Sequence, residues 1–330
     1  MIIAFPHKPG KGGPGSFQIR FEKYLKEHGW QVTYPEDKIK PDVVMVVGGT
    51  KKLWWLAKMK FKGIPVVHRL AGLNWLHKHK KFTPKKYFYA ESSNLILKII
   101  RSIFASHIVY QSEFVREWWT KKGWFTSAAS TIIYNGVDLD IFSPTKSDAT
   151  KISLLCVEGN IDYTPYAIDL LNYLHDELVE KGDYESLIVY GGFEKPENQF
   201  KLNPKIEYKG KVSAGEIHKV YKDAVYLSLD INAACPNTVI EALASGIPII
   251  RYDTGALKEL VGENSGIIAD YGSNIWQVST LNFKNLSNAA IEGLTDQIIF
   301  KHNARNRAKA MFDINMVFKQ YEVILKETRN

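Results

Sequence analysis

Cysteine is scarce in this chain of 330 residues, which contains only Cys156 and Cys235. Each cysteine lies beside an apolar stretch, and neither belongs to a spacing typical of zinc ligands. This argues against a disulfide framework and a zinc site, and it favours two reduced, buried thiols. The chain also lacks an Asp-x-Asp pair at a predicted strand end, so we expect no metal ion to be bound.

Long apolar runs are also missing. No run can span a bilayer, and the first residues, MIIAFPHKPGKGG, contain too short an apolar stretch for a signal peptide. We therefore expect a cytoplasmic protein. The composition, 45% hydrophobic and 24% charged, is typical of a globular chain. A chain of this length fits two domains of about 150 residues each.

Charge is distributed unevenly along the sequence. The formal net charge is +8, but residues 51–125 alone hold 16 Lys or Arg against 3 Glu. Six of the 8 tryptophans lie in the same segment, namely Trp54, Trp55, Trp75, Trp118, Trp119 and Trp124. We interpret the segment as a surface for an anionic partner, with an anionic membrane at the inner face ranked above nucleic acid. A solvated basic face with tryptophans in the core is the alternative.

Apolar segments of strand length alternate with amphipathic segments through both halves of the chain. This alternation predicts two parallel, doubly wound α/β domains of Rossmann type. The polar linker TKSDATK suggests an N-terminal domain over residues 1–145 and a C-terminal domain over residues 146–330. The last helix could pack back on the N-terminal domain.

Turn and cap residues predict several local features. Residues 6–17 are expected to form a Gly-rich loop, and Ser16, near its end, is expected to cap the helix that follows. Residues 77–89, HKHKKFTPKKYFY, show no stable period and predict a mobile loop over the site. Ser213 and Glu216 are spaced as a capping box, which predicts a helix that starts there.

The most informative stretch is PNTVIEALASGIPII, residues 236–250. It predicts a Pro-marked turn and then a short helix whose first turn holds Asn237, Thr238 and Glu241. In doubly wound folds, a loop that leads from a strand into a helix N-terminus is where anionic ligands bind. On spacing alone, the simpler role of Thr238 and Glu241 is a capping box.

That stretch, together with the run Asn135-Gly-Val-Asp and Phe142, closely resembles the donor-site signature of the fourth family of retaining glycosyltransferases. The resemblance covers most of the chain and implies a GT-B fold, in which two Rossmann-like domains face each other across a cleft. It also implies transfer of a sugar from a nucleoside-diphosphate sugar to a hydroxyl of a glycan or lipid-linked acceptor, with retention of configuration and without a cofactor.

The resemblance also implies the site residues. Glu241 would bind the ribose hydroxyls and His68 would stand near the donor sugar, so these two are the candidate catalytic residues, although a lone His at a strand end is more often structural. The predicted donor site comprises Gly12, Gly13, Gly15, Asn160, Lys211, Val212, Cys235, Asn237, Thr238 and Glu241. The predicted acceptor site comprises Arg69, Asn74 and Trp75.

The chain departs from the family pattern at three positions. Ala233 stands where the family has the acid that contacts the donor sugar, eight positions before Glu241. Asn160 and Pro165 stand where the family has an Arg and a Lys that touch the diphosphate.

Other residues of the chain could compensate for these losses. Asp230 and Asn232 lie near Ala233 in sequence, although strand alternation would place them on the opposite face. The cations that could replace the lost charge are Lys209, Lys211, Arg251 and Lys11. The departures leave three readings open: an enzyme with an altered donor site, a non-catalytic relative that binds a sugar nucleotide or a partner, and a glycosyltransferase that acts on DNA.

Overall fold

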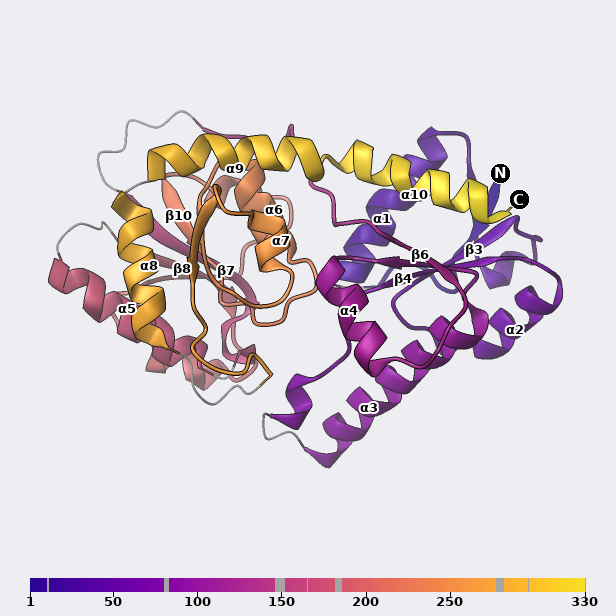
Figure 1. The fold of residues 1–330 in the computed structure, drawn as a ribbon, viewed down its shortest axis with the longest axis horizontal. Helices are drawn as coiled ribbons and strands as arrows, with labels where there is room; N and C mark the ends of the chain where they lie inside the picture. The colour runs from indigo at the N-terminus through magenta and orange to yellow at the C-terminus, as the bar shows by residue number, and fades with distance from the viewer. Residues whose placement is uncertain are drawn as a thin grey trace. The chain divides into compact units, whose positions relative to one another are not determined.

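The computed structural model describes residues 1–10, 12–79, 83–145, 152–164, 166–181, 186–276, 282–295 and 297–329. The chain divides into two compact units: unit 1 comprises Met1–Tyr134 and Asn315–Asn330, and unit 2 comprises Asn135–Ile314. Each unit is built on a six-stranded parallel sheet (Figure 1). The predicted class of two doubly wound α/β folds is therefore confirmed. The predicted boundary after residue 145 adjoins residues 146–151, outside the described residues, and stays a prediction.

Unit 1 has the strand order β2-β1-β3-β4-β5-β6. Its strands are β1 (Ile2–Ala4), β2 (Gln31–Thr33), β3 (Val43–Val47), β4 (Val66–Leu70), β5 (His107–Tyr110) and β6 (Ala129–Ile132). Its helices are α1 (Gly12–Glu27), α2 (Leu53–Phe61), α3 (Pro84–Ile99), α4 (Glu113–Lys122) and α10 (Ile314–Arg329), with short turns η1 (Pro35–Asp37), η2 (Leu76–Lys78) and η3 (Ile100–Phe104). Every residue of β3 and β4 is buried, as expected for central strands of a covered parallel sheet.

Unit 2 has the strand order β12-β11-β10-β7-β8-β9. Its strands are β7 (Ser153–Asn160), β8 (Leu187–Gly192), β9 (Glu207–Gly210), β10 (Ala224–Leu227), β11 (Ile249–Tyr252) and β12 (Gly266–Ala269). Its helices are α5 (Ala167–Lys181), α6 (Asn237–Ala244), α7 (Leu257–Val261), α8 (Phe283–Thr295) and α9 (Gln297–Met311), with turns η4 (Ile161–Tyr163), η5 (Pro196–Lys201) and η6 (Ile217–Val220). Helices α5 and α8 pack together over one face of the sheet, and α6 packs with α7 and α9.

The predicted Gly-rich loop after β1 is helical in its second half. Helix α1 begins at Gly12, so Ser16 lies inside the helix and does not cap it. Pro14 occupies the first turn, where a missing N–H costs no hydrogen bond. Gly15 is buried so close to the Gly10 carbonyl that a Cβ would overlap it. These glycines therefore permit a close approach of two chain segments.

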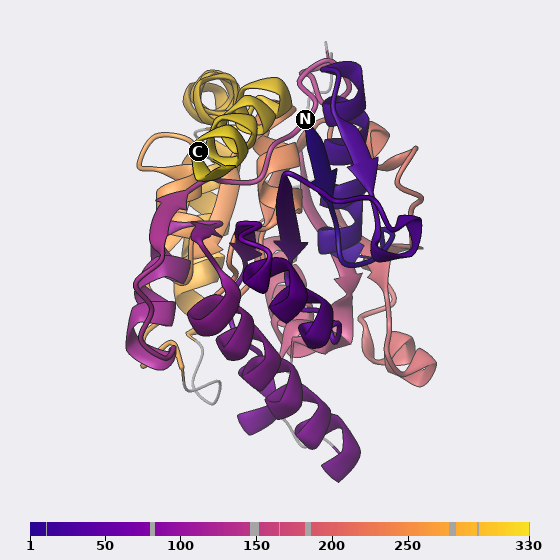
Figure 2. The same cartoon turned by 90° about the vertical axis from the view of Figure 1, so that its right-hand side faces the viewer.

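The predicted loop at residues 77–89 is also partly helical, because α3 begins at Pro84. The Thr83 hydroxyl accepts a hydrogen bond from the Lys86 N–H, and proline is well suited to the first helical position. The amino-terminal half of α3 extends away from the sheet of unit 1 (Figure 2). Residues 80–82 lie outside the described residues.

The helix predicted from Ser213 is wrong, because only the single 3₁₀ turn η6 forms there. Glu216 forms an ion pair with Lys219 in place of a capping box. Gly215 falls in what would have been the first turn, and glycine is the weakest helix former after proline. A short segment with this composition does not overcome the cost of helix nucleation.

The last helix, α10, packs on α1 within unit 1. The Phe318 ring lies 5.1 Å from the Phe21 ring centre and 5.4 Å from the Tyr24 ring centre. Glu322 accepts hydrogen bonds from the Trp30 indole at 3.1 Å and the Tyr24 hydroxyl at 3.3 Å. Among the described residues, no helix combines the length and the apolar character needed to cross a membrane.

Each sheet has one point at which the chain changes direction across it. In unit 1, β1 lies between β2 and β3, and in unit 2, β7 lies between β10 and β8. Doubly wound sheets bind ligands at the carboxyl ends of the strands beside such a switch point. The expected ligand-binding positions are therefore the carboxyl ends of β1 and β3 in unit 1 and the carboxyl ends of β7 and β10 in unit 2.

Candidate functional site

Two carboxyl groups meet at the switch point of unit 2. Glu158 lies near the end of β7, and Asp230 follows the end of β10. The Glu158 carboxylate accepts a hydrogen bond from the Leu229 N–H. Burial raises the pKa of Glu158 well above its ordinary range, with a contribution from the Asp230 charge, and burial also raises the pKa of Asp230. Both carboxyl groups therefore hold their protons to a higher pH than isolated carboxyl groups do.

Glu158 is absent from the site predicted above, although the sequence contains a signal for it. An acid within the otherwise apolar run ISLLCVEGN, near the carboxyl end of a central strand, is unusual enough to mark a functional position. Its Oε1 has no hydrogen-bond partner among the described residues. The same holds for Asn160 Oδ1 and for the buried Tyr166 hydroxyl, whose pKa is raised by burial and by nearby charges that include Asp230. Orphan polar atoms at a sheet edge are places for a ligand to bind.

Asn160 and Lys211 lie side by side at this edge. Asn160 ends β7 and is in register with Gly192 of β8. A Cβ on Gly192 would overlap the Lys211 side chain and would lie 3.0 Å from Asn160 Oδ1. Lys211, which follows β9, therefore reaches the position from which the resembled family extends an arginine. Val212 continues the same loop.

The other candidate cations are placed less favourably. Lys209 forms an ion pair with Glu207 at 2.8 Å. Arg251 is completely buried in β11, and burial lowers its pKa to about 10. Lys11 and Pro165 lie outside the described residues.

Helix α6 starts at Asn237, with Pro236 as its N-cap and without a side-chain cap. Thr238 and Glu241 therefore do not form a capping box, and this simpler reading of the spacing is wrong. The Glu241 carboxylate accepts a hydrogen bond from the Tyr221 hydroxyl at 3.1 Å. The first backbone N–H groups of α6 have no intrahelical partners, so the helix presents donors and the positive end of its dipole.

Asn135 fixes the turn that leads into α6. Its backbone N–H donates to Cys235 Sγ at 3.2 Å, and its side-chain amide donates to the Cys235 carbonyl at 2.7 Å. The same amide donates to Asn237 Oδ1 at 2.8 Å. Cys235 and Cys156 are both free and buried, as predicted. The Asn-Gly-Val-Asp string thus has a structural role in unit 2.

The chain around Ala233 is not an extended strand. Strand β10 ends at Leu227, so the predicted alternation of faces does not reach Asp230. Asn232 has a left-handed backbone with φ of 52°, and its side-chain amide donates to the Ile275 carbonyl at 2.8 Å. Asn232 therefore anchors its loop.

In unit 1, His68 is the central residue of β4 and is completely buried. Its Nε2 lies 2.7 Å from the Gly48 carbonyl oxygen, and because a carbonyl only accepts, Nε2 carries the proton. Burial lowers the pKa of His68 to about 4, assisted by the Arg101 charge and opposed by the Gly48 hydrogen bond. His68 is therefore neutral at pH 7 and braces the segment that follows β3.

The remaining predicted residues of unit 1 fall into two groups. Gly12, Gly13 and Gly15 form the start of α1, beyond the carboxyl end of β1. The predicted acceptor residues follow or end β4, and Arg69 is buried and donates from Nε to the Tyr321 hydroxyl at 3.0 Å. Asn74 donates to Asn94 Oδ1 from its backbone and its side chain, and the Trp75 ring lies beside His79. The donor and acceptor roles of all these residues stay predictions.

Comparisons with known proteins bear on this arrangement. Residues 153–280 match the family described as Glycosyl transferases group 1. The match covers less than half of the chain, but it contains every predicted donor residue of unit 2. A comparison with curated protein sequences gives no match.

Solved structures resemble the chain over nearly its whole length. Sucrose-phosphate synthase from Thermosynechococcus elongatus has a TM-score of 0.77 at 15% identity, covering 99% of this chain and 98% of that one. The fold is GT-B. Anabaena HepE, in complex with UDP and glucose, has a TM-score of 0.71 at 16% identity, with 99% and 100% covered. A glycosyltransferase from Rickettsia africae gives 0.63 at 17%, with 99% and 98% covered. At these identities, the likeness to GT-B structures concerns the fold alone.

Proposed function

We propose that this protein is a glycosyltransferase that moves a sugar from a nucleoside-diphosphate sugar to a hydroxyl of a glycan or lipid-linked acceptor. The proposal is supported by the contact of Lys211 with Gly192 beside Asn160 at the carboxyl end of β7, and by helix α6, which follows the neighbouring strand β10, all within the segment that matches Glycosyl transferases group 1. The complex of Anabaena HepE with UDP and glucose supports a nucleotide-sugar donor. Retention of configuration and independence from metal ions belong to the proposal.

The diphosphate is assigned to the amino end of α6. Backbone N–H groups of Asn237 and Thr238, with the helix dipole behind them, suit an anionic group. The family has an arginine where this chain has Asn160. Lys211 lies beside Asn160 and would supply the missing positive charge. Stabilisation of the departing diphosphate would then rest on these groups, which is the main electrostatic requirement of glycosyl transfer.

The donor sugar is assigned to the Glu158 and Asp230 pair. A pair that shares one proton presents both a hydrogen-bond donor and an acceptor, which matches the hydroxyl groups of a sugar. This pair would take the place of the acid that the family has at the position of Ala233. It also places less negative charge beside the diphosphate than two ionised carboxylates would.

A panel of nucleotide sugars, titrated by calorimetry into wild type and two variants, tests the donor site. Glu241→Ala should weaken donor binding about 100-fold, because charged hydrogen bonds to the ribose are lost. Tyr221→Phe is the matched control, since it removes the hydroxyl that contacts Glu241 but leaves the carboxylate, and its affinity should stay within about threefold. Equal losses in both variants would show that Glu241 acts through the fold. If wild type binds none of the sugars, the reading as a non-catalytic relative is favoured.

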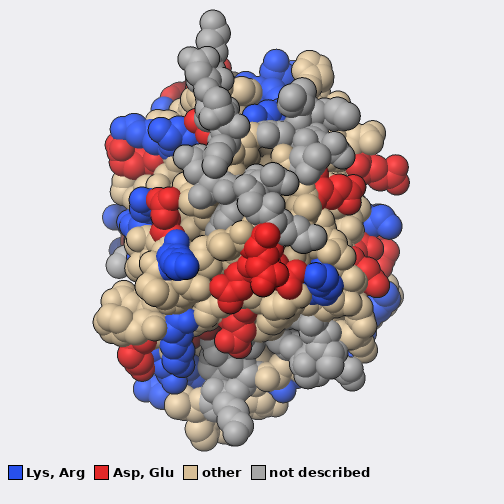
Figure 3. Space-filling view, turned by 90° about the vertical axis from the view of Figure 1, so that its left-hand side faces the viewer, with Lys and Arg blue, Asp and Glu red and all other residues tan. Residues whose placement is uncertain are grey.

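We also propose that unit 1 contacts an anionic membrane surface through residues 51–125. Trp118 and Trp119 are buried, so the alternative of core tryptophans holds for these two. Trp54 and Phe61 on α2 are 89% and 94% exposed, and Phe125 is 88% exposed. Exposed aromatic rings among lysines suit a headgroup region. By contrast, acidic and basic side chains are interspersed on the face over α5 and α8 in unit 2 (Figure 3).

A further inference from the structure

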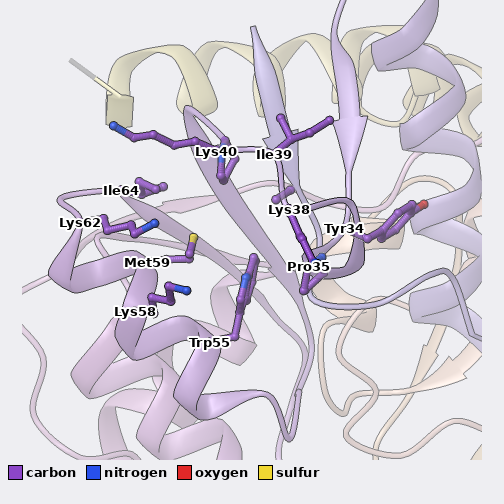
Figure 4. Close-up of a pocket in the computed structure, with 12 residues that line it drawn as sticks. Tyr34, Pro35, Lys38, Ile39, Lys40, Trp55, Lys58, Met59, Lys62 and Ile64 are labelled. Carbon is purple, nitrogen blue, oxygen red and sulfur yellow. The ribbon is translucent and has the colours of Figure 1, made fainter.

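A cavity in unit 1, separate from the candidate site, is ringed by lysines. Its volume is about 360 Å³, and its lining includes Lys38, Lys40, Lys58 and Lys62 but no Asp or Glu. Figure 4 shows Lys58 and Lys62 on the α2 side, with Lys38 across from them and Trp55 between. We call this cavity the lysine pocket. Ammonium groups gathered in this way repel one another and attract an anion.

The charges of the lysine pocket are not neutralised by neighbouring carboxylates. Lys58 lies in the last turn of α2 and Lys62 is the C-cap residue of that helix, so two like charges lie close together at its end. Among the residues that the structure describes, neither forms an ion pair. Nearby acids are engaged elsewhere: Glu36 pairs with Lys52 at 2.6 Å, and Asp42 accepts a backbone N–H of β1 at 2.8 Å. The array therefore has a cost within the protein that a bound anion would relieve.

The wall opposite α2 is held in a defined shape. The Tyr34 N–H donates to Asp37 at 2.8 Å, which closes the turn η1. The ion pair between Glu36 and Lys52 ties this turn to the start of α2. Lys38 then has a left-handed backbone with φ of 55°, an uncommon conformation for a residue other than glycine. Such strained residues concentrate at binding sites, where surrounding contacts enforce them.

The interior of the lysine pocket is apolar. Trp55 and Met59 of α2 line it together with Ile64, which precedes β4, and Pro41, which precedes β3. Ile64 and Pro41 lie at the amino ends of β4 and β3. The pocket is therefore away from the carboxyl ends of these strands and from Gly48, the residue after β3 that His68 contacts. The volume is at the lower end of the range for small-molecule pockets, about 300–1,000 Å³.

We propose that the lysine pocket binds a phosphate monoester carried on a ring-shaped body. Lys58 and Lys62 would contact the phosphate, with Lys38 opposite, while the ring lies against Trp55. The charge and size of a sugar phosphate match these features, whereas the phosphate monoester headgroup of a lipid supplies the same phosphate without the ring. The inference does not depend on the proposed donor site, because none of its residues belongs to unit 2.

Calorimetry at low salt with glucose phosphate, inorganic phosphate and glucose tests the proposal. Glucose phosphate should bind about tenfold more tightly than inorganic phosphate, and glucose should not bind. The double variant Lys58→Gln/Lys62→Gln should lose about tenfold in affinity or more. Lys26→Gln/Lys319→Gln, which removes the same charge from exposed sites of unit 1 outside both the pocket and residues 51–125, should keep wild-type affinity. Trp55→Leu should weaken the binding of glucose phosphate more than the binding of inorganic phosphate.

Vesicles of phosphatidylcholine, with phosphatidate or with phosphatidylserine, distinguish the two sources of the monoester. A soluble ligand is supported if wild type binds glucose phosphate and only the pocket variant, Lys58→Gln/Lys62→Gln, loses this binding. If vesicles with phosphatidate bind more tightly than vesicles with phosphatidylserine at equal charge, and only the pocket variant loses this difference, the same chemistry is supplied by a lipid. The proposal is overturned if neither probe binds, or if both double variants lose affinity equally, since that would reflect general charge. Circular dichroism confirms that each variant is folded.

Discussion

At the scale of single residues, Glu158 and Asp230 are the most unusual feature of unit 2. Two carboxyl groups at the end of a buried sheet have no cation between them among the described residues, and burial raises the pKa of both. An arrangement of this kind costs folding free energy once both groups ionise. Such a cost is expected at a ligand-binding position and is hard to explain as a contribution to stability.

Asp230→Asn should reverse this cost in a pH-dependent way. Because the pKa values are raised, the native state binds more protons than the unfolded state between the ordinary carboxyl pKa, about 4, and the raised values. The free energy of unfolding therefore falls as pH rises through this window. The variant should resemble wild type near pH 4 and have a higher Tm near pH 8, by about 2–4 °C for each 1 kcal/mol of repulsion removed.

Differential scanning calorimetry across this pH range checks the expectation. Glu197→Gln, which neutralises an exposed acid of unit 2, is the control and should leave the pH dependence of wild type unchanged. A Tm difference for Asp230→Asn that is the same at both pH values would show that the pair does not hold a shared proton.

At the scale of elements, α10 shows how much unit 1 depends on the end of the chain. Phe318→Ala removes a buried ring from contact with α1 and should destabilise unit 1 by about 3–5 kcal/mol. Val323→Ala, at a 44% exposed position of the same helix, should cost about 0.5 kcal/mol or less. Urea unfolding followed by tryptophan fluorescence measures this, because 7 of the 8 tryptophans belong to unit 1. Similar midpoints for the two variants would contradict the packing described here.

The strands of both sheets were predictable because they are continuous apolar runs between polar segments. Runs such as residues 42–47 have few alternatives, and covered parallel strands produce them. Helix starts were less predictable, since they depend on contacts far along the chain. Ser112 does cap α4, but Ser213 caps no helix, and sequence spacing alone does not separate the two cases.

The candidate site was predictable to a similar extent. Glu241 and Asn237 belong to the distinctive stretch at residues 236–250. Their position in the helix that follows β10 could therefore be predicted from the sequence. The approach of Lys211 to Asn160 depends on a glycine in β8 that leaves room for a side chain arriving from another strand. Such a contact between distant segments has no signal in one sequence. Glu158 did have a signal, because an acid is unusual within an apolar strand.

At the scale of the whole molecule, the concentration of positive charge in residues 51–125 predicts salt-dependent membrane binding. Vesicles with anionic lipid should retain the protein in flotation at low salt and release it at high salt, because screening weakens surface attraction. Trp54→Ala/Phe61→Ala should reduce retention several-fold, since two exposed rings of α2 are lost. Phe200→Ala, which removes one exposed ring from unit 2, should have no effect.

Duplex DNA in the same assay separates the remaining alternative. Retention by DNA with none by anionic vesicles would favour nucleic acid as the partner of the basic segment. Retention by neither at low salt would leave the segment as a solvated face.

The division of the chain also sets an order of events during synthesis. Unit 2 is one continuous segment, whereas unit 1 needs α10, which follows unit 2 in the sequence and is synthesised after it. Unit 2 can therefore complete its fold while α1 still exposes the aromatic face that Phe318 and Tyr321 later cover. The usual order, in which the amino-terminal domain finishes first, is reversed for this chain. The aromatic face of α1 therefore stays uncovered until α10 has emerged and folded.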